Sequence, residues 1–236
     1  MLEIPNRMGI PESGNSGIDT LELCFDKKHY LSYPKDISYR YNSRGFRDNE
    51  WPEDLTDVIW CVGDSFTVGI GQPFQETWPQ VLEKKTGQRC LNLGEDACSN
   101  DTISLRIQEI CKLHNPKLIV VMWSYLHRRR VKKADGTFWN AHHDQNDFGL
   151  DRDMENFSNN FQAVNKLPTN VINLLIPDAF DGDVKPIREK YKNIILTRKL
   201  DYARDHHHFD VKTSNILSQL IIKQINEFDK TPKYPI

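Results

Sequence analysis

The chain has 236 residues, with 38% hydrophobic residues, 27% charged residues and a formal net charge of -2. This length fits one α/β domain with additions. The nearly neutral charge argues against a general nucleic-acid-binding protein, which would carry a strongly basic surface. No apolar run approaches the roughly 20 residues of a membrane span, so we expect no membrane partner.

The N-terminal region has no basic stretch followed by an apolar one, so we expect no signal peptide and a cytoplasmic protein. The five cysteines include no CxxC pair, which favours reduced and mostly buried thiols. Residues 1–50 lack a clear periodicity and hold Gly, Pro, Asn and Ser throughout. We interpret them as an irregular arm that packs on a main domain of residues 51–236.

Short apolar runs alternate with helical patterns after the arm. They predict five strands, at residues 58–62, 90–93, 118–123, 171–176 and 194–196. Strands that alternate with helices form a mainly parallel sheet covered by helices on both faces. The sequence therefore predicts an α/β fold with a mainly parallel five-stranded sheet.

Two helices are predicted in this part of the chain. One lies between the first and second strands, and the other lies between the second and third strands. The first begins with a capping box formed by Thr77 and Gln80 and ends at Gly87. The second is capped by Ser99 or Asn100. Its predicted apolar face consists of Ile103, Ile107, Ile110 and Cys111.

The segment 134–169 is polar and rich in Asn and Asp. We interpret it as an insertion or lid over the edge of the sheet, with one helix near residues 153–165. A last helix follows the fifth strand. Its predicted core face consists of Ile216, Leu217, Leu220, Ile221, Ile225 and Phe228.

A serine stands where the first predicted strand ends, because residues 58–62 are followed by Gly63, Asp64 and Ser65. Ligands of open parallel sheets bind at the carboxyl ends of the strands. A tight turn there exposes a hydroxyl and aims backbone N–H groups at a developing oxyanion. This favours a nucleophilic serine. The alternative is an ordinary turn in which Asp64 and Ser65 accept local N–H groups.

A second polar cluster, Asp-His-His-His at residues 205–208, precedes the last helix. A serine hydroxyl needs a base to take its proton, and histidine suits this role because its pKa lies near neutrality. Asp205 lies three residues before His208, so its carboxylate can hold the other ring nitrogen. Asp201 is a second candidate for that task.

These two motifs resemble those of the SGNH/GDSL hydrolase superfamily. Residues 63–65, with Thr67 and Gly69, match its first motif block, and residues 205–208 match its last block, Asp-x-x-His. Residues 42–47 resemble the arm that precedes the serine strand in many members. The resemblance spans about residues 39–228.

The resemblance implies the flavodoxin-like three-layer sandwich of the SGNH hydrolases. It also implies an esterase in which Ser65 is the nucleophile, His208 the base and Asp205 its orienting carboxylate. Members of this superfamily hydrolyse small acyl esters, often O-acetyl groups on carbohydrates, so the expected partner is a small-molecule or carbohydrate ester. No cofactor and no metal are implied.

The family builds its oxyanion hole partly from backbone N–H groups. The resemblance assigns one of them to Ser65 itself and another to a glycine of the second block. When the sequence is aligned on Asn92, that glycine position falls at Ala97 or Cys98. Alanine keeps its backbone N–H, so Ala97 is the expected donor, and Gly94 is a second candidate.

The third family block supplies an asparagine side chain, which this chain lacks. Its third strand is followed by Ser124, Tyr125 and Leu126. We expect Asn100 to reach the oxyanion hole from the neighbouring loop instead. The alternative role for Asn100 is a helix cap.

Three further residues are expected to contact the substrate: Asp64, Tyr125 and Arg128. Arg128 belongs to a basic run at residues 127–133, which follows the third strand near the same edge. The run suits recognition of an anionic glycan or a phosphate-bearing ester. The alternative is a solvated positive face.

Two other functions stay open at this stage. One is a catalytically weak or silent module that binds glycans or has a structural role on the same fold, which the altered middle blocks favour. The other is a metal-dependent hydrolase that uses residues 206–208 with His142, His143 and Asp144. The sequence leaves the acyl group, the alcohol and the oligomeric state undetermined.

Overall fold

A five-stranded parallel sheet with the order β4-β3-β5-β8-β9 forms the centre of the molecule. The computed structural model describes residues 17–22, 27–141, 149–177 and 181–230. The strands of the sheet are β3 (Ile59–Gly63), β4 (Cys90–Gly94), β5 (Leu118–Trp123), β8 (Asn170–Leu175) and β9 (Ile194–Ile195). All neighbouring pairs are parallel. The order is the flavodoxin-like 2-1-3-4-5 arrangement, and the predicted fold class is confirmed.

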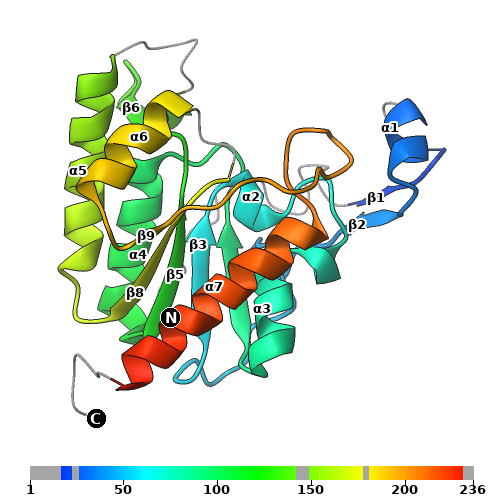
Figure 1. Cartoon of the computed structure of the whole chain (residues 1–236), viewed down its shortest axis with the longest axis horizontal. Coiled ribbons are helices and arrows are strands. Elements are labelled where there is room, and N and C mark those ends of the chain that lie inside the picture. Colours follow the sequence, from blue (N-terminus) through cyan, green and yellow to red (C-terminus); the bar gives the residue numbers. More distant parts are fainter. Residues whose placement is uncertain (1–16, 23–26, 142–148, 178–180, 231–236) are drawn as a thin grey trace.

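Helices cover both faces of the sheet (Figure 1). On one face lie α3 (Trp78–Thr86) and α7 (Val211–Lys230), which pack against each other. On the other face lie α4 (Asn100–His114), α5 (Leu150–Asn165) and α6 (Asp181–Lys190). None of the helices among the described residues has both the length and the hydropathy that crossing a membrane requires.

The two faces of β5 enter two separate hydrophobic cores. Ile119, Val121 and Trp123 pack under the helices of one face, and Leu118, Val120 and Met122 pack under the helices of the other. Side chains of a strand alternate between faces, so a strand covered by helices on both sides is a continuous apolar run. This explains why the sequence alone predicts a strand at residues 118–123.

The ends of the helices differ in part from the prediction. Gly87 follows α3 in a left-handed conformation, as predicted. The capping box is wrong, because the Thr77 hydroxyl donates to the carbonyl of Phe74 instead of accepting from α3. Ser99, not Asn100, caps α4, since its side chain accepts the N–H of Thr102.

The interpretation of residues 134–169 as a lid is wrong for the helical part. In α5, Phe157, Phe161 and Val164 are buried in the core beside Trp123. The helix is therefore one of the covering layers. Before it, β6 (Arg129–Lys132) and β7 (Phe138–Ala141) form an antiparallel hairpin.

The core face of the last helix is partly as predicted. Leu217 and Ile221 are fully buried, and Ile225 and Phe228 pack against the same core. Ile222 joins them, whereas Ile216 and Leu220 are only half-buried. Of the cysteines in the described residues, Cys61, Cys90 and Cys98 are free and buried, and Cys111 is free and half-buried.

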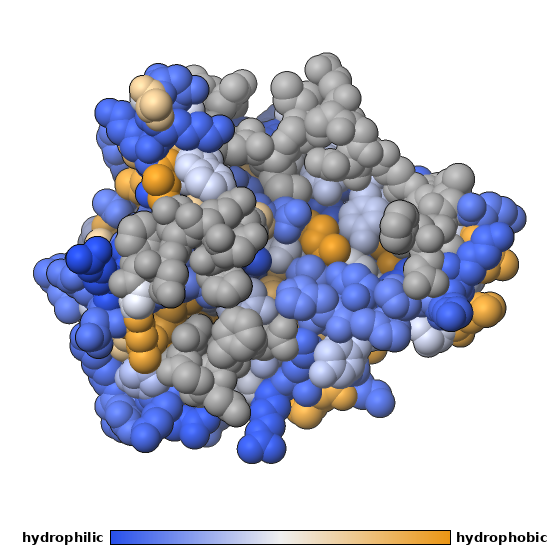
Figure 2. Space-filling model, turned by 90° about the horizontal axis from the view of Figure 1, so that it is seen from above, coloured by the Kyte–Doolittle hydropathy of each residue, from blue (hydrophilic) through white to orange (hydrophobic). Residues whose placement is uncertain are grey.

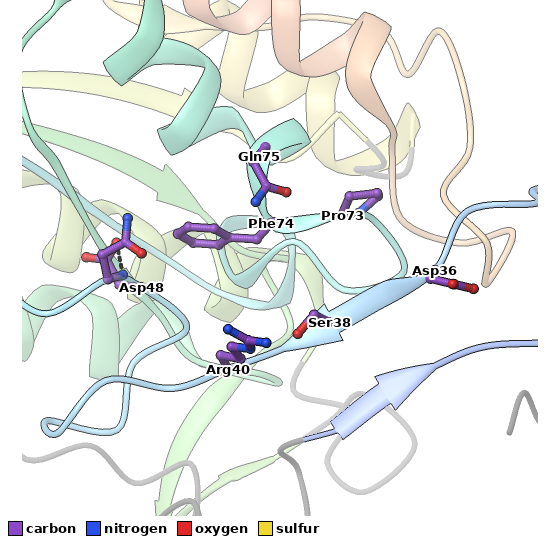
Figure 3. Close-up of a pocket in the computed structure, with 8 residues that line it drawn as sticks. Asp36, Ser38, Arg40, Asp48, Pro73, Phe74 and Gln75 are labelled. Carbon is purple, nitrogen blue, oxygen red and sulfur yellow. Dashed lines mark hydrogen bonds between the residues drawn. The ribbon is translucent and has the colours of Figure 1, made fainter.

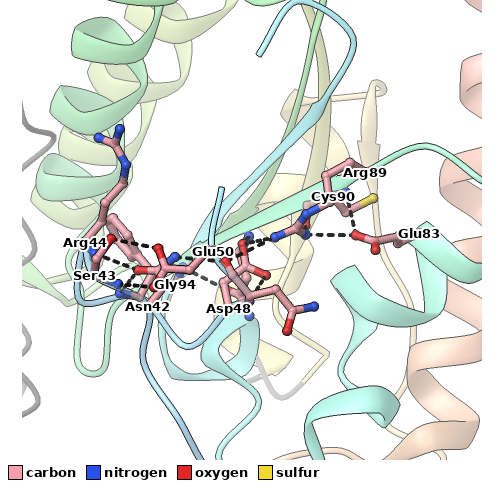
Figure 4. A network of polar contacts seen from close by, with 12 residues as sticks. Asn42, Ser43, Arg44, Asp48, Glu50, Glu83, Arg89, Cys90 and Gly94 are labelled. Carbon is pink, nitrogen blue, oxygen red and sulfur yellow. Dashed lines mark hydrogen bonds and ion pairs between the residues drawn. The ribbon is translucent and has the colours of Figure 1, made fainter. Parts of the chain in front are cut away.

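The described part of the arm contacts the main domain through polar groups and through Phe46, which is buried in the hydrophobic core. It contains β1 (Gly17–Asp19), α1 (Lys27–Ser32) and β2 (Ile37–Tyr39). Further along, the fully buried carboxylate of Asp48 pairs with Arg89 at 2.8 Å, and Arg89 also pairs with Glu83 of α3 (Figure 4). The proposed boundary at residue 50 stays a prediction.

Candidate active site

Ser65 is the first residue of the short helix α2 (Ser65–Val68), directly after the carboxyl end of β3. The preceding turn is tight. A Cβ on Gly63 would lie 2.2 Å from Oγ1 of Thr67 and 2.9 Å from the carbonyl oxygen of Met122. Only glycine fits there without displacing neighbours. The turn therefore presents Ser65 at the edge of the sheet where α/β folds bind ligands.

Asp64 caps α2 and is completely enclosed, with 0% of its surface exposed. One carboxylate oxygen accepts the N–H of Phe66 at 3.1 Å. The other accepts the hydroxyl of Ser124 at 2.5 Å and Nη1 of Arg128 at 3.0 Å. Its side chain is thus occupied by protein donors, and this arrangement fixes the turn that carries Ser65 to the end of β5.

His208 and Asp205 form the expected pair. The ring nitrogen Nδ1 of His208 lies 2.5 Å from Oδ2 of Asp205, whose other oxygen accepts the N–H groups of His207 and His208. Burial raises the pKa of Asp205, but the hydrogen bond and charge of His208 outweigh it and bring the pKa to about 2. Nε2 of His208 is buried and has no hydrogen-bond partner among the described residues.

Asp201, the second candidate for the orienting carboxylate, has a different role. Its oxygens accept the N–H of Lys212 at 2.7 Å and the N–H and hydroxyl of Thr213 at 3.0 and 2.6 Å. These donors belong to the first turn of α7, whose N–H groups have no partner within the helix. Asp201 therefore stabilises the start of α7.

The turn that carries Ser65 and the segment of residues 205–208 lie together at one end of the sheet (Figure 1). The ring of Phe66, next to Ser65, lies 4.5 Å from the ring of His208, centre to centre. The carbonyl of Gly71 accepts the N–H of Arg204 at 3.0 Å. Groups about 140 positions apart in the sequence are thus brought to the same place by the fold.

The backbone N–H groups of Ser65 and Ala97 have no hydrogen-bond partner within the described part of the chain. Ala97 has φ 56°, in the left-handed region that favours glycine. Glycine would adopt this backbone conformation without the steric cost that a Cβ brings. The prediction of Gly94 as the second candidate donor of the oxyanion hole is wrong, because its N–H donates to Oδ1 of Asn92.

The side chain of Asn100 is occupied elsewhere. Its Nδ2 donates to the carbonyls of Ser124 and Tyr125 at 3.3 and 3.1 Å, and its Oδ1 accepts the N–H of Ser124. Asn100 is neither the helix cap nor a free side-chain donor in this structure. It holds the turn after β5, on which Ser124 reaches Asp64.

We expect Ala97→Gly to stabilise the protein. The left-handed conformation costs a non-glycine residue about 1–2 kcal/mol, and the added flexibility of the unfolded chain returns part of that. The free energy of unfolding in urea should rise by about 0.5–1 kcal/mol, without loss of activity, since the N–H is kept. Ala141→Gly, at a buried strand position with ordinary φ, is the matched control and should be destabilising.

The basic run after β5 is not a uniformly solvated face. Arg128 is 8% exposed and pairs with Asp64, while Arg129 pairs with Asp153 of α5 at 2.8 Å. Arg130 lies over the ring of Phe138. Tyr125 is buried and lies next to Phe66. The run therefore serves mainly to join β5 to its surroundings.

Above the sheet, the surface is mainly hydrophilic, with small hydrophobic patches (Figure 2). A separate pocket of about 330 Å³ lies on the arm side. There, Phe74 and Gln75 face Ser38 and Arg40 across the cavity (Figure 3). The described residues contain no group of three or more His, Cys, Asp or Glu arranged to hold a metal ion. His142, His143 and Asp144 lie outside the described residues.

Three residues that the sequence did not single out contact the turn that carries Ser65 or the segment after it: Ser124, Tyr39 and Arg47. Ser124 follows directly on β5, so the rule that ligands gather at strand carboxyl ends was a signal for it. Arg47 lies within residues 42–47, whose resemblance to a family arm gave no role to the individual residues. Tyr39 carried no signal.

No protein-family model and no curated protein matches this sequence. Solved structures do resemble it. Esterase EstA from Pseudoalteromonas sp. is 12% identical, covering 74% of this chain and 100% of EstA, with a TM-score of 0.50. A lipolytic protein of the G-D-S-L family from Veillonella parvula is 13% identical over 70% of this chain and 96% of its own, with a TM-score of 0.47. The chain has the SGNH hydrolase fold.

Proposed function

We propose that this chain is a serine esterase that hydrolyses a small acyl ester, with an O-acetylated carbohydrate as the candidate substrate. The observation that carries the proposal is the unpartnered, buried Nε2 of His208 beside the turn that presents Ser65. A base whose other nitrogen is held by a carboxylate, next to a serine at the tip of a strand, is the arrangement required for acyl transfer.

In the proposed mechanism, His208 takes the proton of Ser65 while Oγ attacks the ester carbonyl. Asp205 stays ionised and stabilises the imidazolium that forms. His208 then gives this proton to the leaving alcohol, and an acyl-enzyme remains on Ser65. A water molecule, deprotonated by His208, releases the acid and restores the serine. Catalytic hydrogen bonds are often longer in a free enzyme and tighten when substrate binds.

The proposed oxyanion hole consists of the N–H groups of Ser65 and Ala97, which are free of partners among the described residues. Preorganised donors of this kind stabilise the negative charge that develops on the carbonyl oxygen. Asp64 and Arg128 position the nucleophile turn in this proposal, and Tyr125 remains the candidate substrate contact. Asn100 fixes the turn after β5.

The occupied side chain of Asn100 favours a second candidate, a catalytically weak or silent glycan-binding module on the same fold. A missing oxyanion donor typically costs about 2.7–4 kcal/mol of transition-state stabilisation. Turnover of p-nitrophenyl acetate that depends on Ser65 would exclude this module. Binding of acetylated oligosaccharides without turnover would favour it.

The proposal predicts stoichiometric labelling by a fluorophosphonate. EstA was solved inhibited by monoethylphosphonate, and phosphonylation of a serine requires the activated hydroxyl that esterases have. Intact-protein mass spectrometry should show one adduct per chain, and peptide mapping should locate it on Ser65. Ser65→Ala is the blank, and Ser104→Ala in α4 is the control for loss of a buried serine. Labelling that persists in Ser65→Ala would contradict the proposal.

A further inference from the structure

Arg47 of the arm is a buried cation, 1% exposed, that pairs with no carboxylate among the described residues. It donates to backbone carbonyls alone. Nη1 donates to Val68 at 3.3 Å and to Gly69, and Nη2 donates to Gln72 at 2.8 Å and Ser38 at 3.0 Å. Burying a charge without a counter-ion costs free energy. An apolar side chain would therefore serve a purely structural role at a lower cost in folding free energy.

The carbonyls that Arg47 binds belong to residues 68–72, the segment that leaves the nucleophile helix. The first of them lie at the end of α2, where the carbonyls carry partial negative charge. Tyr39 binds the same segment, since its hydroxyl accepts the N–H of Gly71 at 2.9 Å. The guanidinium of Arg47 lies 4.3 Å above the ring of Tyr39. The two residues thus form one unit, here named the arm clamp.

The other side of the clamped segment contacts the base. Gly71 has φ 77°, and a Cβ there would lie 3.0 Å from Cβ of Ala203 and 3.1 Å from Cγ of Asp205. The carbonyl of Gly71 accepts from Arg204, and the N–H of Ala203 donates to the carbonyl of His208 at 2.9 Å. Residues 69–72 are therefore packed between the arm on one side and the Asp205–His208 pair on the other.

We infer that the arm clamp, Arg47 with Tyr39, positions the base against the nucleophile by fixing residues 69–72 between them. This inference rests on the proposed function, because it assigns a task in the same reaction. Neither residue touches the reacting atoms. A displacement of about 1 Å in a catalytic group can cost about 100-fold in rate. Loss of a residue that fixes the intervening segment should therefore change kcat more than it changes KM.

The decisive variants are Tyr39→Phe and Arg47→Ala. Tyr39→Phe removes one hydroxyl and should leave the melting temperature near that of the natural protein. We expect kcat for p-nitrophenyl acetate to fall several-fold at nearly unchanged KM. Tyr41→Phe is the matched control, because its hydroxyl has no hydrogen-bond partner among the described residues, and it should change nothing. Arg47→Ala should lower kcat by about 100-fold.

Exogenous guanidinium, at tens of millimolar, should restore part of the activity of Arg47→Ala. The space left by the side chain adjoins the 330 Å³ pocket, because Ser38 both lines that pocket and accepts from Arg47. Arg89→Ala, which removes an arginine paired with Asp48 and Glu83, is the control. It should lower stability and gain nothing from guanidinium.

Amide hydrogen exchange tests the clamp without any catalytic assay. Tyr39→Phe should speed exchange in peptides covering 66–72 and 201–210, and Tyr41→Phe should not. Unchanged exchange in 201–210 together with unchanged kcat would overturn the inference, even if Ser65 is labelled. Faster exchange in a protein that no fluorophosphonate labels would support the clamp and reject the proposed esterase. If Arg47→Ala does not fold, Tyr39→Phe decides.

Discussion

Replacing His208 with alanine is expected to lower kcat for p-nitrophenyl acetate by about 10⁶-fold, close to the loss expected for removing the whole triad. Without the imidazole, Ser65 keeps its proton and is a poor nucleophile at neutral pH. The backbone donors of the oxyanion hole remain, so a residual rate above that in water should persist. Initial rates and the rate of fluorophosphonate labelling should fall together, because both depend on the same proton transfer.

The neighbouring histidines provide the control for this variant. His207→Ala removes a ring that lies 4.9 Å from the ring of His208, and it keeps the backbone N–H of residue 207 that donates to Asp205. It should keep most of the activity. Equal losses in His207→Ala and His208→Ala would show that the segment acts through its fold, and would contradict the assignment of His208 as the base.

Asp205→Asn is expected to lower kcat by about 10⁴-fold while leaving the fold intact. An amide keeps nearly the same shape, but it also presents an NH₂ group to Nδ1, and it cannot stabilise the imidazolium. The ring is then held in the wrong tautomer for accepting the proton of Ser65. Kinetics at saturating substrate, with circular dichroism to check folding, measure this effect.

The pH dependence gives the same assignment a second test. The pKa of Asp205 is about 2, below that of a free carboxyl, so this group is ionised in the folded protein at every pH above about 3. Protonation of Asp205 should therefore add no step of its own to the acid limb of log kcat/KM between pH 3 and 6. A slope of two between pH 3 and 6 would contradict the assigned pair.

Asp201→Asn is the matched control for Asp205→Asn. Asp201 binds the first turn of α7 and not the histidine ring. The variant should lose about 1 kcal/mol of unfolding free energy, as caps do, and keep its kcat. A large catalytic loss in Asp201→Asn with a small one in Asp205→Asn would reverse the two roles.

The sequence by itself determined the sheet and the chemical groups worth examining. Residues 118–123 are apolar throughout because both faces of the strand are buried. An unbroken run of apolar residues can be recognised from the sequence alone. Ser65 and the pair Asp205 and His208 stand in short local motifs, so their residue types and spacing were visible without coordinates. Their roles remain proposals that the experiments above decide.

The tertiary structure decided which partner each polar group takes. Asn100 could cap a helix or serve an oxyanion hole on sequence grounds, but the turn after β5 supplies three backbone partners for its amide. Spacing alone favoured Asp205 over Asp201, and the structure shows Asp201 bound to the start of α7 and Asp205 bound to His208. No local sequence pattern indicates that Arg47 donates to the backbone carbonyls of residues 68–72. The physical reason is that burial periodicity is local along the chain, whereas hydrogen-bond partners are chosen by groups that only folding brings together.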